Sequence, residues 1–195
     1  KYIKINTLFP HKLQEIVEKS NAKFIHITTD CVFDGKKGYY NENDNHTETN
    51  VYGSSKSLGE PENATVIRTS IIGEELNHKK SLLEWVISKK NCTINGFANH
   101  FWNGVTCLTL SNIIENTITN NLYWKGVRHI FSHDTVSKYK LCSIINEVYE
   151  LNINIEKHKT KNTIDKTLNT IYNSTFDIDT IKNQIILQKK FNIIC

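Results

Sequence analysis

The chain has 195 residues, a formal net charge of +4 and a charged fraction of 23%. This length is enough for one domain or one and a half with a sizeable hydrophobic core, and the small, distributed positive charge does not indicate nucleic-acid binding. No apolar run is long enough to cross a bilayer and no charged-then-apolar leader is present, so nothing in these residues indicates export or membrane anchoring.

The spacing of cysteines and histidines indicates the redox compartment of a protein and whether it binds a metal ion. The five cysteines are scattered and never spaced as Cys-x-x-Cys, which is typical of reduced thiols in a cytoplasmic protein rather than of a disulfide or zinc framework. The eight histidines show neither His-x-x-x-His nor His-x-x-Glu-His spacing. We therefore expect a cytoplasmic protein that needs no metal ion.

Apolar spacing predicts helices and strands that alternate along the chain. The first helix is expected over 8–19, with one apolar stripe running from Leu8 to Val17. A buried strand at 23–27 follows and ends at Thr28 and Thr29. The later elements are expected, in chain order, as a helix near Tyr52, a strand at 64–68, a helix at 80–90, a strand at 92–94, a loop at 96–106, a helix at 106–119, a strand at 127–131, and helices at 137–150 and 180–190. Such alternation indicates a mostly parallel sheet covered on both faces.

The stretch 28–35 and the stretch 52–60 carry the clearest chemistry. Ligands of open α/β sheets bind at the carboxyl ends of strands, where Thr28 and Thr29 are expected. Tyr52 and Lys56 are four residues apart, so a helix places them on one face. A neighbouring ammonium lowers the pKa of a phenol, and a threonine hydroxyl can hydrogen-bond the oxygen that the phenol protonates. We expect Thr29, or as second choice Thr28, to act with Tyr52 and Lys56.

These stretches carry a family resemblance. The run Thr-Thr-Asp-x-Val-Phe-Asp-Gly and the run Tyr-Gly-x-Ser-Lys-x-x-Gly-Glu resemble the extended short-chain dehydrogenase/reductases, most of all the dTDP-4-dehydrorhamnose reductase branch. The resemblance implies reduction of the 4-keto group of a nucleotide-linked deoxysugar in surface-polysaccharide biosynthesis. It implies NADPH as cofactor, with NADH as the alternative, and Thr29, Tyr52 and Lys56 as the catalytic triad. A nucleotide sugar is the expected partner, without nucleic acid or membrane, and a homodimer is a possible assembly.

Further site residues follow from position and from the resemblance. In related reductases the residues after the strand at 64–68 flank the nicotinamide, while Arg68 itself is open to a structural ion-pair role. The loop at 96–106 is rich in aromatic and amide groups, which can bind a substrate or equally pack in the core. The expected cofactor-binding residues are Thr28, Tyr52, Lys56, Ser70 and Ile71. The expected substrate-binding residues are Thr29, Cys31, Phe33, His100 and Asn103.

A glycine-rich turn for the cofactor pyrophosphate occurs nowhere in the sequence. We interpret the chain as N-terminally truncated and inactive alone, with a naturally degenerate member as the alternative. The expected fold is α/β, a Rossmann-like doubly wound, mostly parallel sheet lacking its N-terminal glycine-rich βαβ part, plus a small C-terminal substrate-binding subdomain. Residues 1–75 are expected to be the C-terminal part of the NADP-binding domain with the triad. Residues 76–195 are expected to form the substrate-binding portion, interleaved with remaining Rossmann elements.

Two other functions stay open. An NAD-dependent sugar-nucleotide epimerase or dehydratase of the same superfamily would use the same triad but recycle its nicotinamide. A non-catalytic, nucleotide-binding regulatory subunit would keep the fold without turnover. The intact triad argues against the regulatory subunit, whereas the absent glycine-rich turn favours it.

Overall fold

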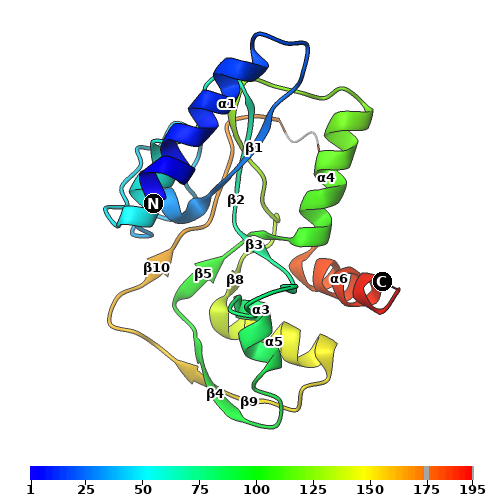
Figure 1. The fold of residues 1–195 in the computed structure, drawn as a ribbon. Helices are drawn as coiled ribbons and strands as arrows, with labels where there is room; N and C mark the ends of the chain where they lie inside the picture. Colours follow the sequence, from blue (N-terminus) through cyan, green and yellow to red (C-terminus); the bar gives the residue numbers. More distant parts are fainter. Residues whose placement is uncertain (174–175, 195) are drawn as a thin grey trace.

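A parallel three-stranded sheet forms the centre of one half of the molecule. The computed structural model describes residues 1–173 and 176–194. The strands lie in the order β1 (Ile25–Thr29), β2 (Thr65–Thr69) and β7 (Gly126–His129). The helices α1 (Phe9–Val17) and α4 (Cys107–Thr119) lie on opposite sides of this sheet (Figure 1). The expected Rossmann-like α/β class with mostly parallel strands is confirmed.

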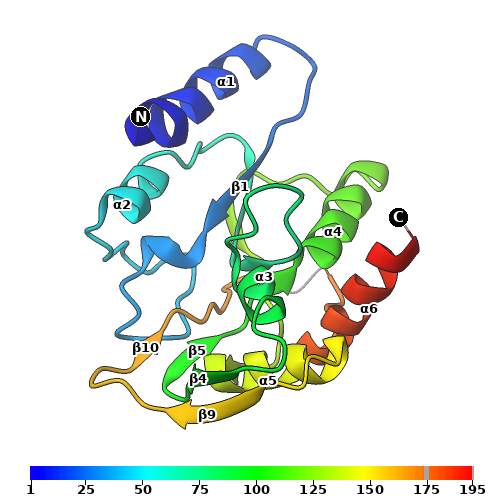
Figure 2. The ribbon, with the colours of Figure 1, turned by 60° about the horizontal axis from the view of Figure 1, so that its bottom comes forward.

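The N-terminal helix packs differently from the sequence prediction. A π-helical segment η1 (Ile3–Leu8) runs directly into α1, so the helical region begins before residue 8. The predicted apolar stripe is not buried among the described residues, because Leu8, Phe9 and Ile16 are 57%, 61% and 63% exposed. The segment instead lies beside α2 (Val51–Ser57), as Figure 2 shows.

Close backbone contact holds this N-terminal segment to α2. The Asn6 amide donates to the Ser55 hydroxyl at 3.0 Å, and the Thr7 hydroxyl donates to the Ser55 carbonyl at 2.7 Å. At Gly59, a Cβ atom would lie 1.7 Å from the Asn6 carbonyl oxygen, so no larger residue fits. The helix therefore depends on glycine and hydrogen bonds where the sequence pattern had suggested apolar burial.

The other half of the molecule contains short strands that join distant segments. In one sheet β5 (His100–Trp102) lies between β10 (Ile164–Asp165) and β8 (Val136–Ser137). Two further parallel pairs join β3 (Ile71–Ile72) to β6 (Val105–Thr106), and β4 (Thr93–Phe97) to β9 (Asn154–His158). The prediction of a loop over 96–106 is wrong, because these residues pair with strands far away in the chain.

The helices expected after residue 80 are confirmed, and the sequence explains where most of them begin. Ser81, Thr106 and Ser137 each accept a hydrogen bond from the backbone N–H three residues later, as N-cap hydroxyls do. Apolar side chains of the helices capped by Ser81 and Ser137 meet in the largest core cluster, which includes Leu83 and Leu141, whereas those of α4 pack in a second cluster with Ile67. Besides α4, the helices are α3 (Leu82–Ile87), α5 (Lys138–Tyr149) and α6 (Ile181–Ile194). Within residues 1–173 and 176–194, no helix is long and apolar enough to cross a membrane.

Arg68, in the central strand β2, is a structural ion-pair partner. Its side chain is 2% exposed, and its Nε donates to Glu60 Oε1 at 3.0 Å. Two further nitrogens lie 2.8 Å from His129 Nε2 and 2.7 Å from His46 Nε2. The guanidinium also lies 5.3 Å from the centre of the Phe33 ring. A buried guanidinium needs this many partners, because it keeps its charge and has five N–H donors.

A C-terminal strap, residues 164–171, ties the two halves together. The strap follows the loop after β1: Asp165 N–H donates to the Gly35 carbonyl at 2.7 Å, and Asn169 N–H donates to the Tyr40 carbonyl at 2.7 Å. His129 Nδ1 lies 2.7 Å from the Asn169 carbonyl, and the backbone N–H of Ile171 donates to Glu42 at 3.0 Å. The Arg68 network and the strap are therefore one connected polar system.

We predict that stability falls as the pH drops from about 6.5 towards 4. Burial is the main cause that lowers the pKa of His26 and of His129 from 6.5 to about 4, with Lys56 and Arg68 respectively as further causes. The unfolded state therefore takes up protons first, so the stabilisation is complete above pH 6.5 and is lost through pH 4. Melting temperature measured by circular dichroism across this range checks the prediction, and H129Q should reduce the slope. The exposed His158 provides the control H158Q, and a pH-independent melting temperature of the wild type would contradict the prediction.

Candidate active site

Thr29 lies at the carboxyl end of β1, with its hydroxyl fixed by its own chain. The hydroxyl accepts a hydrogen bond from the Cys31 backbone N–H at 3.1 Å and donates to Asp30 Oδ1 at 3.2 Å. These bonds cap the short 3₁₀ turn η2 (Asp30–Val32) that follows the strand. A polar side chain at a strand end caps the next turn in this way, and here it also points the hydroxyl at the ligand-binding edge of the sheet.

The helix α2 is positioned by its first residues and by one glycine. Asn50 accepts from the Gly53 N–H at 2.9 Å as the N-cap, and Glu48 accepts from the backbone N–H groups of Thr49 and Asn50. A Cβ atom at Gly53 would lie 2.3 Å from the Cys31 carbonyl oxygen. Glycine therefore lets the helix approach the turn that carries Thr29.

The structure brings Thr29 and Tyr52 together. The Thr29 hydroxyl is close enough to the phenol to favour its ionised form, and Tyr52 is 40% exposed. The pKa of Tyr52 is raised, mainly by burial and next by Cys31, rather than lowered by Lys56 as the sequence had suggested. Burial lowers the pKa of Lys56, whose charge is instead coupled to Glu60. Tyr52 therefore holds its proton firmly at neutral pH.

Asp30 is a residue that the sequence interpretation missed. Its carboxyl is 6% exposed, is hydrogen-bonded to Ser70 and Thr29, and has a pKa raised above its ordinary value by burial. Ser70 in turn accepts from the indole N–H of Trp102 at 2.9 Å. The signal available in the sequence was an acid placed directly between the buried strand and an apolar Val-Phe pair. Asp30 thus connects the triad threonine to Ser70 and β5.

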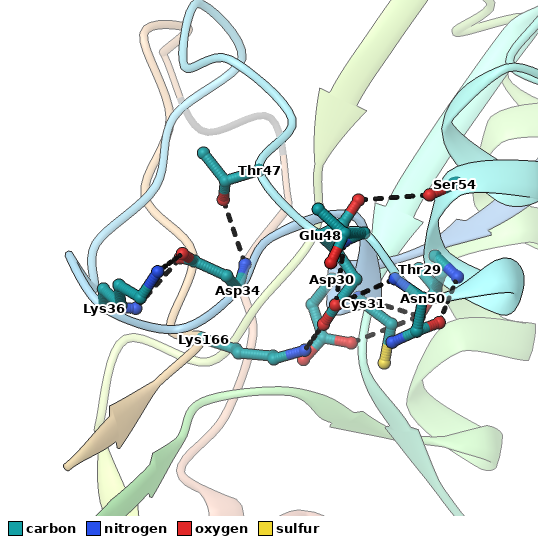
Figure 3. Close-up of polar contacts among 12 residues, drawn as sticks. Thr29, Asp30, Cys31, Asp34, Lys36, Thr47, Glu48, Asn50, Ser54 and Lys166 are labelled. Atoms are coloured by element: carbon teal, nitrogen blue, oxygen red, sulfur yellow. Dashed lines mark hydrogen bonds and ion pairs between the residues drawn. The ribbon is translucent and has the colours of Figure 1, made fainter. Parts of the chain in front are cut away.

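Glu48 and Lys166 form an ion pair beside this turn. Lys166, in the strap, donates to Glu48 Oε2 at 3.1 Å (Figure 3). Lys166 also acts electrostatically on Asp30 and Cys31. The same glutamate orders the start of α2, so the strap and the triad helix share one carboxylate.

Two residues predicted to bind substrate serve the fold instead. Phe33 is fully buried and stacks on Tyr40 with ring centres 4.1 Å apart. Asn103 is 4% exposed, and its amide both donates to and accepts from the backbone of Leu168, at 2.8 and 2.9 Å. Neither side chain is available to a ligand, so these two predictions are corrected: local sequence could not show that Tyr40 and the strap would cover them.

The remaining predicted residues differ in exposure and in their contacts. Cys31 is half-buried, and burial raises the pKa of its thiol. Ser70 is engaged by Asp30 and Trp102, whereas Ile71 is 49% exposed beside it. His100 stacks on Phe97 and is hydrogen-bonded to Thr160, at the opposite end of β5 from Trp102.

Some of these residues fit one end of a nicotinamide cofactor. The Thr28 hydroxyl is buried and has no hydrogen-bond partner among residues 1–173 and 176–194, and the ammonium of Lys56 and the exposed Ile71 are the other candidates. An unpaired buried hydroxyl is costly and is explained when a ligand supplies its partner. The pyrophosphate end has no such fit, because the sequence contains no glycine-rich turn. The described part of the chain holds no group of three or more His, Cys, Asp or Glu that could bind a metal ion.

The fold and these residues define a class of protein. A parallel sheet with a threonine at its carboxyl edge, facing a Tyr-x-x-x-Lys helix, is the arrangement of the extended short-chain dehydrogenase/reductases. Residues 1–190 match the family described as RmlD substrate binding domain. The chain belongs to this family.

Known proteins with similar sequence or structure agree with this class. A curated relative, methionine adenosyltransferase 2 subunit beta of Danio rerio, is 26% identical over 72% of this chain, which spans 48% of that protein's length. The crystal structure of dTDP-4-dehydrorhamnose reductase from Bacillus anthracis with NADP has a TM-score of 0.78 at 20% identity, covering 96% of this chain and 72% of that one. A UDP-N-acetylglucosamine 4-epimerase from Methanobrevibacter ruminantium has a TM-score of 0.75 at 16% identity, covering 97% and 69%.

We predict that G53A destabilises the protein. The new methyl group would meet the Cys31 carbonyl oxygen, which belongs to the backbone and cannot rotate away, so α2 must shift. Overpacking of this kind costs about 1–3 kcal/mol of unfolding free energy, measurable by urea denaturation. L58A, at a neighbouring position that is 67% exposed, is the control and should change stability little. If G53A is as stable as the wild type, the close approach of α2 to this turn is not a constraint.

Proposed function

We propose that this chain carries the catalytic half of an NADPH-dependent reductase acting on the 4-keto group of a nucleotide-linked deoxysugar. The observation that carries the proposal is the position of Thr29 at the carboxyl edge of β1 beside Tyr52 of α2, with Lys56 one helical turn further along that helix. Membership of the RmlD substrate binding domain family supports a sugar-nucleotide substrate. The expected setting is nucleotide-sugar and surface-polysaccharide biosynthesis in the cytoplasm.

Each triad residue has a task that its position supports. Thr29, held by Asp30 and the Cys31 N–H, orients the carbonyl oxygen of the substrate. Tyr52 delivers the proton to that oxygen as a general acid, and the burial that raises its pKa makes it a weaker acid than a free tyrosine. Lys56 is proposed to hold the cofactor ribose, with Thr28, Ser70 and Ile71 nearby. NADPH, when bound, supplies the hydride that the carbonyl carbon accepts, and NADH is the alternative donor.

Two other functions have an observation in their favour. A sugar-nucleotide epimerase is among the similar solved structures, and the same superfamily includes dehydratases; such enzymes recycle their nicotinamide, so they would not consume added NADPH steadily. A non-catalytic nucleotide-binding subunit is favoured by the absent glycine-rich turn and by a curated relative that is named as a subunit. Tight nucleotide binding without turnover in the complete encoded protein would support the subunit.

We predict that Y52F in the complete encoded protein lowers kcat by roughly 10²-fold or more while NADPH binding persists. Removing the phenol hydroxyl removes the proton donor but leaves the ring in place. Steady-state oxidation of NADPH with a dTDP-4-keto-6-deoxy sugar measures turnover, and calorimetry measures cofactor binding. Y39F changes a tyrosine that is 58% exposed and outside the triad, so it should behave as the wild type. Near-normal kcat in Y52F would exclude Tyr52 as the acid.

A further inference from the structure

Lys138, the first residue of α5, lies beside the candidate active site without being part of the triad. Its ammonium is 5.4 Å from the centre of the Trp102 ring. It also interacts electrostatically with Asp30 and Cys31, the two residues that follow Thr29, and it lowers the pKa of His100 after the effect of burial. Lys138 is therefore surrounded by residues of β5 and of the turn after β1.

The ammonium of Lys138 has no hydrogen-bond acceptor or ion-pair carboxylate in the part of the chain that the structure describes, although burial lowers its pKa. The other lysine near this turn, Lys166, is paired with Glu48 at 3.1 Å. Asp30 attracts Lys138, but its carboxyl is already hydrogen-bonded to Ser70 and Thr29. Lys138 is half-buried, so its ammonium loses part of its hydration, and the Trp102 ring compensates only part of that loss.

We propose that Lys138 binds an oxyanion of the substrate and thereby positions the sugar against Thr29 and Tyr52. An oxyanion fits because it supplies both the charge and the several acceptors that the ammonium lacks. Two parts of a substrate have this chemistry: the diphosphate of a sugar nucleotide and a carboxylate on the sugar ring. The inference rests on the proposed function for the identity of the substrate, but not on turnover or on cofactor binding.

The support around Lys138 favours a binding role over a purely structural one. Trp102 is 4% exposed and is anchored to Ser70 through its indole N–H, so its ring is a fixed surface for the ammonium. Ser70 is bonded in turn to Asp30, which holds the Thr29 hydroxyl. A ligand held by Lys138 is thereby linked through three fixed side chains to the threonine that orients the carbonyl.

Calorimetric titration without cofactor tests the proposal on the complete encoded protein. The probes are UDP and dTDP for the diphosphate, UDP-glucuronate against UDP-glucose for a sugar carboxylate, and free rhamnose as a neutral sugar. K138M keeps the side-chain length without the charge, and K138R keeps the charge. K140M, at an exposed position two residues further along α5, is the matched control.

If the diphosphate is the ligand, K138M should bind UDP or dTDP about 10–100-fold more weakly, while K138R and K140M bind within a few-fold of the wild type. If the carboxylate is the ligand, K138M should lose only the preference for UDP-glucuronate over UDP-glucose. K138M should melt close to the wild type, because Lys138 is half-buried and forms no ion pair in the described part of the chain.

Two results would overturn the proposal: wild-type affinity of K138M for every probe, or no binding of any charged probe by the wild type. A different result would reject only the reductase function: the wild type shows no turnover, but it binds a charged probe and K138M weakens that binding. The inference about Lys138 would then still hold.

Discussion

The structure depends on keeping the charge of Arg68 paired inside the central strand. A guanidinium does not deprotonate in proteins, so a buried one must keep its partners or destabilise the fold by several kcal/mol. Its partners come from separate segments: Glu60 just after α2, His46 in the loop before α2, and His129 at the end of β7. The two ends of the segment that contains α2, and the end of β7, are thereby fixed against one strand. This is why α2, which carries Tyr52 and Lys56, has a defined position over the carboxyl edge of β1.

The strap extends this constraint to the other half of the molecule. The Nδ1 atom of His129 is within hydrogen-bonding distance of the backbone carbonyls of Tyr40 and Asn169. The Glu42 carboxylate accepts from the backbone N–H of His129 in β7 and of Ile171 in the strap. Burial opposes the ionisation of Glu42, but these N–H donors lower its pKa overall, so it stays a carboxylate. Residues that the chain reaches only after position 164 thus hold the loop that precedes the triad helix. The site is assembled from both ends of the sequence.

Periodicity and short motifs predicted the helices and strands, whose formation depends on neighbouring residues in the sequence. The helix from residue 137, for example, begins at a serine cap and repeats leucine and isoleucine at helical spacing, and both features operate within a few residues. Thr29 and Tyr52 were predicted because a strand end and a helix start fix their positions. Asp30 was missed, and Phe33 and Asn103 were expected to bind substrate although they are buried, because their surroundings come from segments tens of residues away. Trp102, expected in a loop, pairs in a strand for the same reason.

The protonation state of Tyr52 bears on the proposed proton transfer. Reduction of a carbonyl needs a group that gives up a proton to the oxygen, whereas oxidation of an alcohol needs one that removes it. Burial and the neighbouring Cys31 both favour the protonated phenol, and the Thr29 hydrogen bond only partly opposes them. Lys56 interacts with Glu60 and His26 instead of neutralising a phenolate. A raised pKa keeps the phenol protonated but makes it a weaker acid, so the proposed proton transfer depends on how Thr29, held by Asp30, brings the carbonyl oxygen to Tyr52.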